Sequence, residues 1–131
     1  MSTTRAEAWT YAALRVIAGA LLTVHGVTKL FGVLGHDAIP FGEQLWFGGV
    51  IELVGGTLVA IGLFTRAAAF LCSGMLAVAY FQFHWKLAFA GWQWLPAVNG
   101  GELAVVYCFL FLYICARGPG PLSLDAQRGA R

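Results

Sequence analysis

Long apolar runs separated by short polar breaks make up most of the chain. They cover about residues 9–34, 45–64, 67–89 and 98–116. A helix needs ~20 apolar residues to cross a bilayer, and the runs approach or exceed that length, although the fourth has a shorter uninterrupted apolar part. None alternates between apolar and polar positions as a strand would, and backbone groups in lipid must pair within their own segment. The pattern predicts an all-α fold, a transmembrane four-helix bundle that forms one domain over residues 1–131 with a short C-terminal tail.

The composition supports a membrane protein and excludes several other classes. Hydrophobic residues make up 60% of the chain and charged residues 11%, compared with about 25% charged residues in an average soluble domain. Such an apolar chain is not disordered. Its net charge of +2, without a basic run, argues against nucleic acid as a partner. The expected partners are membrane lipids, and the expected location is the inner cell membrane, which the chain crosses several times.

Arginine occurs on one side of the predicted bundle only. The N-terminus, the turn between the second and third helices and the tail carry Arg5, Arg66, Arg117, Arg128 and Arg131. The two connections on the other side contain no arginine. Because positively charged residues are retained in the cytoplasm, both termini are predicted to be cytoplasmic.

Glycine recurs along the second apolar run and predicts a helix-packing surface. Its members are Gly48, Gly55, Gly56 and Gly62. Small residues at such a spacing let two membrane helices approach closely. Glu52 lies four residues after Gly48 and three before Gly55, so we expect its side chain to face protein and to avoid lipid.

The first run carries three ionisable residues on one helical face. Arg15, His25 and Lys29 fall within roughly 80° of arc at about 100° per residue. Counted in residues from the ends of their runs, His25 lies at a depth similar to that of Glu52, and Lys29 lies one helical turn shallower. We therefore expect the Glu52 carboxylate to lie within hydrogen-bonding or ion-pair reach of His25 or Lys29, because an unpaired charge in hydrocarbon is costly.

The third and fourth runs offer a similar arrangement at the same depth. His84 and Lys86 end one run and Glu102 opens the next. Together with the first set, these residues predict a polar pocket in the outer half of the bundle. The six candidate residues for ligand binding or proton handling are His25, Lys29, Glu52, His84, Lys86 and Glu102. A structural role as buried ion pairs is the alternative.

The spacing of Cys72, Cys108 and Cys115 fits neither a zinc site nor a CxxC pair, so we expect no metal site. Each cysteine lies inside an apolar run and is interpreted as a small apolar side chain.

Several short motifs together resemble the DoxX family of small four-helix membrane proteins. In order along the chain they are Arg15, HGVTK at 25–29, ELVGG at 52–56, GLFTR at 62–66 and GPGPLSLD at 118–125. Each motif alone is weak, but their order and spacing are specific. The resemblance implies a membrane protein some of whose relatives are small subunits of thiosulfate:quinone oxidoreductase. Others occur in membrane complexes that handle thiol and oxidative stress, and more distant ones act in assembly or trafficking.

The first functional hypothesis is a small membrane subunit of a quinone-linked or thiol and oxidative-stress oxidoreductase system. A quinone needs an apolar slot, a polar donor and a titratable group, for which Lys29 and His25 are the candidates, with Glu52 orienting His25. The sequence contains no haem, iron–sulfur or flavin motif. The chain itself is therefore expected to carry no cofactor other than a bound quinone, and any redox centre would belong to a protein partner.

Two other functions stay open on the sequence. The chain could be a non-catalytic membrane anchor, chaperone or assembly factor, in which the polar cluster only fixes helix register. A small transporter is less favoured, because four helices are few for alternating access unless the chain forms a homo-oligomer. The sequence does not decide whether the chain is an enzyme, and it assigns no catalytic residue.

Overall fold

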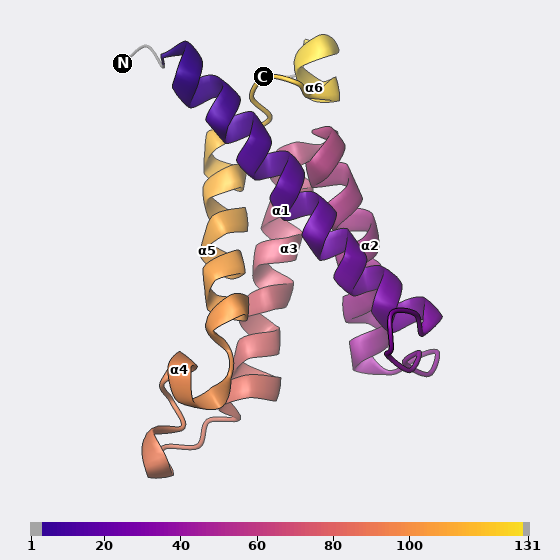
Figure 1. Ribbon diagram of the computed structural model, residues 1–131, viewed down its shortest axis with the longest axis vertical. Helices are drawn as coiled ribbons and strands as arrows, with labels where there is room; N and C mark the ends of the chain where they lie inside the picture. Colours follow the sequence, from indigo (N-terminus) through magenta and orange to yellow (C-terminus); the bar gives the residue numbers. More distant parts are fainter. Residues whose placement is uncertain (1–3, 130–131) are drawn as a thin grey trace.

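Helices and helical turns are the regular elements of residues 4–129, the part of the chain that the computed structural model describes (Figure 1). No strand occurs in this part. The long elements are α1 (Arg5–Phe31), α2 (Gln44–Ile61), α3 (Thr65–Ala79) and α5 (Glu102–Arg117). The short ones are the π-helical turn η1 (Tyr80–Trp85), the 3₁₀ turn η2 (Ala90–Trp92), α4 (Pro96–Asn99) and α6 (Leu124–Gln127).

Three helical segments are long and apolar enough to cross a membrane. They are α1, α2 and the continuous segment Thr65–Trp85, which joins α3 to η1. With 16 residues α5 extends over about 24 Å, which is less than the ~30 Å of a hydrocarbon core. The predicted all-helical membrane fold is confirmed for three segments, and a fourth crossing stays a prediction.

Capping fixes the ends of α1, which begins earlier and ends earlier than the predicted run of 9–34. The Thr4 hydroxyl accepts a hydrogen bond from the Glu7 amide at 3.2 Å, and the Glu7 carboxylate accepts one from the Thr4 amide at 2.6 Å. This capping box satisfies two amides that a helix start leaves unpaired. At the other end Gly32 adopts a left-handed conformation with φ of 61° and stops the helix.

Left-handed residues also end the other helices before the predicted boundaries. Gly62 follows α2 with φ of 71°, so α2 stops three residues short of 64. Lys86 and Leu87 have φ of 56° and 55°, and the third helix therefore ends at Trp85 rather than at 89. Ahead of α5, Gly100 with φ of 74° separates α4 from it, so the predicted start at 98 is wrong for the helix.

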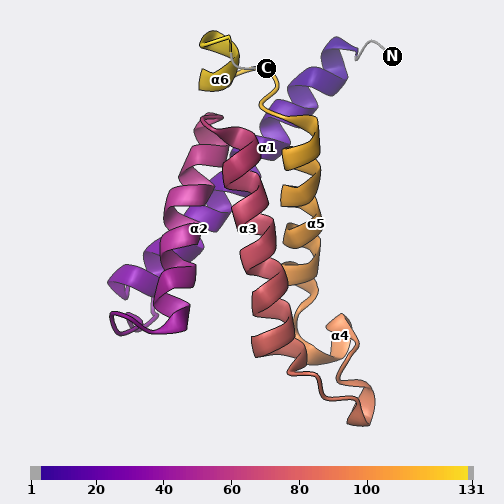
Figure 2. The ribbon, with the colours of Figure 1, turned by 180° about the vertical axis from the view of Figure 1, so that it is seen from behind.

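The helices form two pairs that meet at one end of the molecule and separate towards the other (Figures 1 and 2). α1 packs along α2 and α3 along α5, while a smaller contact between α2 and α3 joins the pairs. We call the end with the start of α1, the α2–α3 turn and α6 the tail end. The opposite end, with the connections 32–43 and 86–101, is called the pocket end.

A glycine seam brings the backbones of α1 and α2 into contact. A Cβ added at Gly19 would lie 2.5 Å from the Ala60 amide nitrogen, and one added at Gly26 would lie 2.4 Å from that of Leu53. On the facing helix, a Cβ at Gly56 would lie 2.8 Å from the Gly19 carbonyl oxygen. Real side chains do not tolerate such distances, so this pair of helices depends on glycine at these positions.

Gly55 and Gly56 lie in contacts between helices, as predicted, whereas Gly48 and Gly62 do not. Gly55 faces α3, where an added Cβ would lie 2.5 Å from the Cys72 sulfur. Gly48 has no neighbour within 4 Å of an added Cβ, so its packing role is wrong. Gly62 is buried but packs against Ser123 of the tail, since it lies beyond the end of α2.

At the tail end, Arg15 ties α2 to the C-terminal segment. Its side chain is fully buried. One terminal nitrogen donates to the carbonyls of Val59 and Ala60, both at 2.7 Å. The other donates to the carbonyls of Pro121 and Leu122 at 3.2 and 2.8 Å. A helix leaves its last carbonyls unpaired, and Arg15 satisfies two of them in α2.

Asp125 and Arg66 form further hydrogen bonds between segments at the tail end. The Asp125 carboxylate accepts hydrogen bonds from the amides of Phe64 and Thr65 and from the Thr65 hydroxyl, at 2.8–3.0 Å. It thus caps the start of α3 from the tail. Arg66 donates to the carbonyls of Cys115 and Ala116 at the end of α5, at 2.6 and 2.7 Å.

Candidate functional site

The candidate site is built around an ion pair between α1 and α2. The Lys29 ammonium lies 2.7 Å from Glu52 Oε1. Glu52 is 4% exposed and faces the α1–α2 seam, as its position among the glycines predicts. The expected contact of Glu52 with Lys29 is present, and within residues 4–129 it is the sole pair of opposite charges within 4.0 Å.

A polar pocket of about 240 Å³ surrounds this pair on the α3–α5 side. Its walls come from α1, α2, α3, η1 and α5 and from Gly100. The lining residues are Leu22, His25, Lys29, Glu52, Leu76, Ala79, His84, Gly100, Leu103, Ala104 and Tyr107. Four of the six predicted residues therefore share one cavity, namely His25, Lys29, Glu52 and His84.

The two histidines take positions that differ from the expected hydrogen-bonded arrangement. His25 is exposed, and within the described residues no hydrogen bond joins its ring to Glu52. The prediction that Glu52 orients His25 is therefore wrong for this structure. The half-buried His84 stacks on the Tyr80 ring, with 6.4 Å between the ring centroids.

Lys86 and Glu102 do not belong to the pocket, which corrects the prediction for both. Lys86 is exposed in a left-handed conformation, because the chain turns away after η1. Glu102 is exposed in the first turn of α5, where a carboxylate interacts favourably with the helix dipole. Neither forms an ion pair in the described part of the chain.

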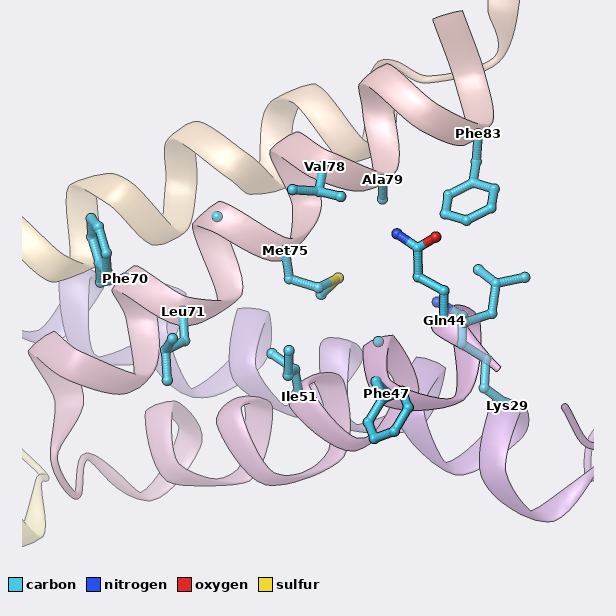
Figure 3. Close-up of a pocket in the computed structure, with 13 residues that line it drawn as sticks. Lys29, Gln44, Phe47, Ile51, Phe70, Leu71, Met75, Val78, Ala79 and Phe83 are labelled. Carbon is cyan, nitrogen blue, oxygen red and sulfur yellow. The ribbon is translucent and has the colours of Figure 1, made fainter. Parts of the chain in front are cut away.

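An apolar groove of about 340 Å³ lies on the other side of Lys29, between α2 and α3 (Figure 3). Figure 3 shows the Lys29 and Gln44 side chains at one end of the groove and apolar side chains along the rest of it. The apolar lining includes Phe47, Ile51, Phe70, Leu71, Met75, Val78 and Phe83. Lys29 and Ala79 line both cavities, so the groove and the polar pocket meet at the ion pair.

The second carboxylate oxygen of Glu52 is the least satisfied polar atom of the site. Oε2 is buried and has no hydrogen-bond partner among the described residues. Leaving a buried charged acceptor without a donor costs about 1–3 kcal/mol or more. The described residues therefore leave one buried acceptor of the ion pair without a donor.

Sequence reasoning missed Tyr107 and Tyr80. Tyr107 lines the polar pocket from α5. Tyr80 holds the connection before α5: its hydroxyl donates to the Trp94 carbonyl at 2.8 Å and accepts from the Asn99 amide group at 3.1 Å. Tyrosine in an apolar run is typical of a residue at the membrane interface, so the residue type alone does not predict a position in this pocket or beside it. No group of three metal-ligating side chains occurs within residues 4–129.

Comparisons with known proteins give one family and one relative. The family model described as DoxX matches residues 10–85. An uncharacterized protein of Haemophilus influenzae is 40% identical over 116 residues, which cover 86% of this chain and 85% of the relative. No solved structure matches the chain.

Proposed function

The chain belongs to the DoxX family, and we propose that it binds an isoprenoid quinone as the small membrane subunit of an oxidoreductase system. The quinone ring would occupy the polar pocket and its isoprenoid tail the apolar groove. The tail would leave the protein towards lipid between α2 and α3.

The observation that carries this proposal is that two chemically different cavities share Lys29, the half-buried partner of Glu52. Small-molecule sites are mostly apolar, with a few polar groups that fix orientation. Here the apolar groove ends at Lys29, and the polar pocket begins there. A ligand with a small polar ring and a long apolar chain matches this division, whereas a wholly polar solute would leave the groove empty.

Three side chains would act on the ring. Lys29 has donors beyond the one used by Glu52 and would hydrogen-bond to a ring oxygen. His25 and His84 line the same pocket, and an imidazole ring can donate or accept a hydrogen bond to the ligand. Because the sequence contains no haem, iron–sulfur or flavin motif, the protein partner would supply the electron carrier.

The proposed placement in the membrane has four crossings and cytoplasmic termini. α5 would be the fourth crossing, with the Arg117 side chain reaching the interface beyond its short apolar stretch. The start of α1, the α2–α3 turn and α6 lie at the same end of the molecule (Figure 1). That end carries Arg5, Arg66 and Arg128, which favours the cytoplasmic side. The polar pocket would then lie in the outer half of the inner cell membrane.

The direct test is to purify the full chain in mild detergent and analyse its organic extract by mass spectrometry. We expect an isoprenoid quinone at a level close to one per chain. Glu52→Gln should lose most of it, whereas Glu102→Gln should retain it, because this matched acid-to-amide change lies outside the pocket. Quinone at only the level of an unrelated membrane protein, or an equal amount in both variants, would contradict the proposal.

A membrane anchor or assembly factor is the second candidate, and the position of the ion pair favours it. Lys29 and Glu52 join α1 to α2 at the glycine seam, where a pair could serve helix register alone. In that case Glu52→Gln should lower thermal stability in detergent and leave the extracted lipids unchanged. Measuring both quantities on the same preparation separates the two functions.

A further inference from the structure

We propose that the connection 86–101 is a membrane-interface anchor, in which the exposed side chains of Leu87, Phe89 and Trp92 insert among phospholipids at the pocket end. The partner of this surface is the bilayer, at the boundary between its headgroups and its acyl chains. The contact with lipid would exist whether or not the pocket binds a quinone. The position of the connection, its surface chemistry and its hydrogen bonds support it.

The helices on either side place the connection at the edge of the hydrocarbon core. The segment Thr65–Trp85 has 21 residues and extends over about 30 Å, which matches the thickness of that core. The chain therefore leaves the hydrocarbon near Trp85, and Figures 1 and 2 show the connection at this end of the molecule. α5, with 16 residues and about 24 Å, is shorter than the core, so the depth beside its start at Glu102 is left to the connection.

The surface of the connection is apolar and almost uncharged. Leu87, Phe89 and Trp92 are 62–69% exposed, and Lys86 is the sole ionisable residue in the stretch 86–101. Tryptophan is enriched where lipid meets water, because its ring is amphipathic. Water alone would leave the three side chains unburied, whereas the interface covers them and lets the Lys86 ammonium reach the headgroups.

The second connection at the pocket end, residues 32–43, has a different chemistry. It also exposes two large apolar side chains, Leu34 and Phe41. However, the exposed Asp37 lies between them in the sequence, and the exposed Glu43 follows. A carboxylate is costly to move out of water. Asp37 is therefore an aqueous reference point at the same end of the molecule.

Hydrogen bonds within the protein pair much of the backbone of the connection 86–101. The Tyr80 hydroxyl donates to the Trp94 carbonyl at 2.8 Å, and the Asn99 amide group donates to the Gln93 carbonyl at 2.9 Å. Turn hydrogen bonds of 2.9–3.3 Å engage further amides along the connection. Irregular backbone is tolerated near hydrocarbon only where its polar groups find such partners. The pairing thus allows this segment to lie at the edge of the core.

The test measures the depth of a nitroxide label in vesicles of phosphatidylethanolamine and phosphatidylglycerol. The full chain carries the label at Phe89→Cys or, as the matched control, at Asp37→Cys. Cys108 and Cys115 are replaced by alanine, while the fully buried Cys72 is retained. Electron paramagnetic resonance then compares collisions of the label with oxygen, which enters lipid, and with a water-soluble nickel chelate.

We expect the label at position 89 to collide mainly with oxygen and the label at position 37 mainly with the nickel chelate. Equal access of the chelate to both positions would overturn the lipid anchor and would indicate an aqueous loop, open to a protein partner. That result would leave the proposed quinone site untouched, because the pocket is tested separately by the organic extract.

A second measurement needs no label and uses the native tryptophan. The emission that Trp92→Tyr removes should be quenched by lipid brominated near its headgroup and protected from aqueous iodide. Tyrosine retains an amphipathic ring at this exposed position, so the variant should fold like the wild type. Emission that iodide quenches and brominated lipid spares would overturn the insertion of Trp92.

Discussion

Arg15 at the tail end and Glu52 at the pocket end are both buried ionisable residues on the contact between α1 and α2, but their surroundings differ. Arg15 donates four hydrogen bonds to backbone carbonyls, and only its Nε lacks a partner. Glu52 has one partner for two oxygens. The fold therefore satisfies nearly all of the Arg15 donors, whereas half of the Glu52 carboxylate lacks a donor.

The helices also pack more closely around Arg15 than around Glu52. At the tail end, α1 crosses behind α2 and α3, and the C-terminal segment with α6 lies over the α2–α3 turn (Figure 2). At the pocket end, the helix pairs separate, and both cavities lie between them. A buried charge at the first end holds segments of the chain together, while Glu52 at the second end lines a cavity. Removing these charges should therefore affect different properties of the protein.

The largest loss of stability should follow Arg15→Ala. It removes four hydrogen bonds to carbonyls of α2 and of the tail, among which the Val59 carbonyl keeps a second donor, the Gly62 amide. We expect the free energy of unfolding to fall by about 3–5 kcal/mol, the range for breaking a buried charged network. Thermal unfolding in detergent would measure it. Arg15→Lys should recover only part of the loss, because an ammonium cannot reproduce the planar fork that spans both segments. A loss below about 1 kcal/mol would remove the distinction between the two ends.

The glycine seam between these ends should be nearly as sensitive. Gly26→Ala places a Cβ 2.4 Å from the Leu53 amide nitrogen, so α1 and α2 must separate. Overpacking of this kind costs about 1–3 kcal/mol. Gly48→Ala is the matched control, since its Cβ meets nothing within 4 Å and alanine favours the helix by up to about 1 kcal/mol. Equal effects of the two changes on the unfolding temperature would contradict the seam.

Acid should weaken the tail end through Asp125. Burial raises the pKa of this carboxyl, but hydrogen bonds from Thr65 and Phe64 and the charge of Arg128 lower it further, to below its ordinary value. A carboxyl with a lowered pKa in the folded state stabilises the fold when it is ionised. Its contribution is complete above about pH 4 and is lost as the pH falls through the folded-state pKa.

Asp125→Asn tests this contribution. The variant should be less stable than the wild type by about 1–2 kcal/mol at neutral pH, because a charged acceptor is replaced by a neutral one. The difference should shrink as the pH falls below about 4. Unfolding temperatures across this interval, compared with those of Glu102→Gln, would measure it. A difference that does not depend on pH would show that the Asp125 charge has no part in holding the tail.

The sequence predicted the features that depend on helical periodicity. One face of α1 was expected to carry Arg15, His25 and Lys29; Arg15 is buried and Lys29 half-buried, whereas His25 is exposed. The pairing of Lys29 with Glu52 followed from depth and charge, and it is present. Such features need only the regular geometry of a helix, which the residue spacing contains.

The features that depend on irregular backbone could not be predicted. The partners of Arg15 are backbone carbonyls up to 107 residues away in the chain. Because every residue has a carbonyl, the residue types do not indicate which ones Arg15 contacts. The expected second cluster of His84, Lys86 and Glu102 is absent, because the left-handed residues Lys86 and Leu87 end the helix early. The exposure of His25 depends on the distance between the two helix pairs, and the hydrophobic pattern of the sequence does not determine that distance.

The smallest effect on stability should follow His25→Gln, and it makes the comparison of the two ends sharpest. The side chain is exposed and has no hydrogen bond within the described residues, so the free energy of unfolding should change by less than about 0.5 kcal/mol. If His25 exchanges protons with a bound ring, the same variant should alter the pH dependence of quinone binding. Binding constants from pH 5 to 8, measured beside unfolding temperatures, would separate the two properties. A variant that loses stability but keeps the wild-type pH profile would place His25 with Arg15 among the structural residues.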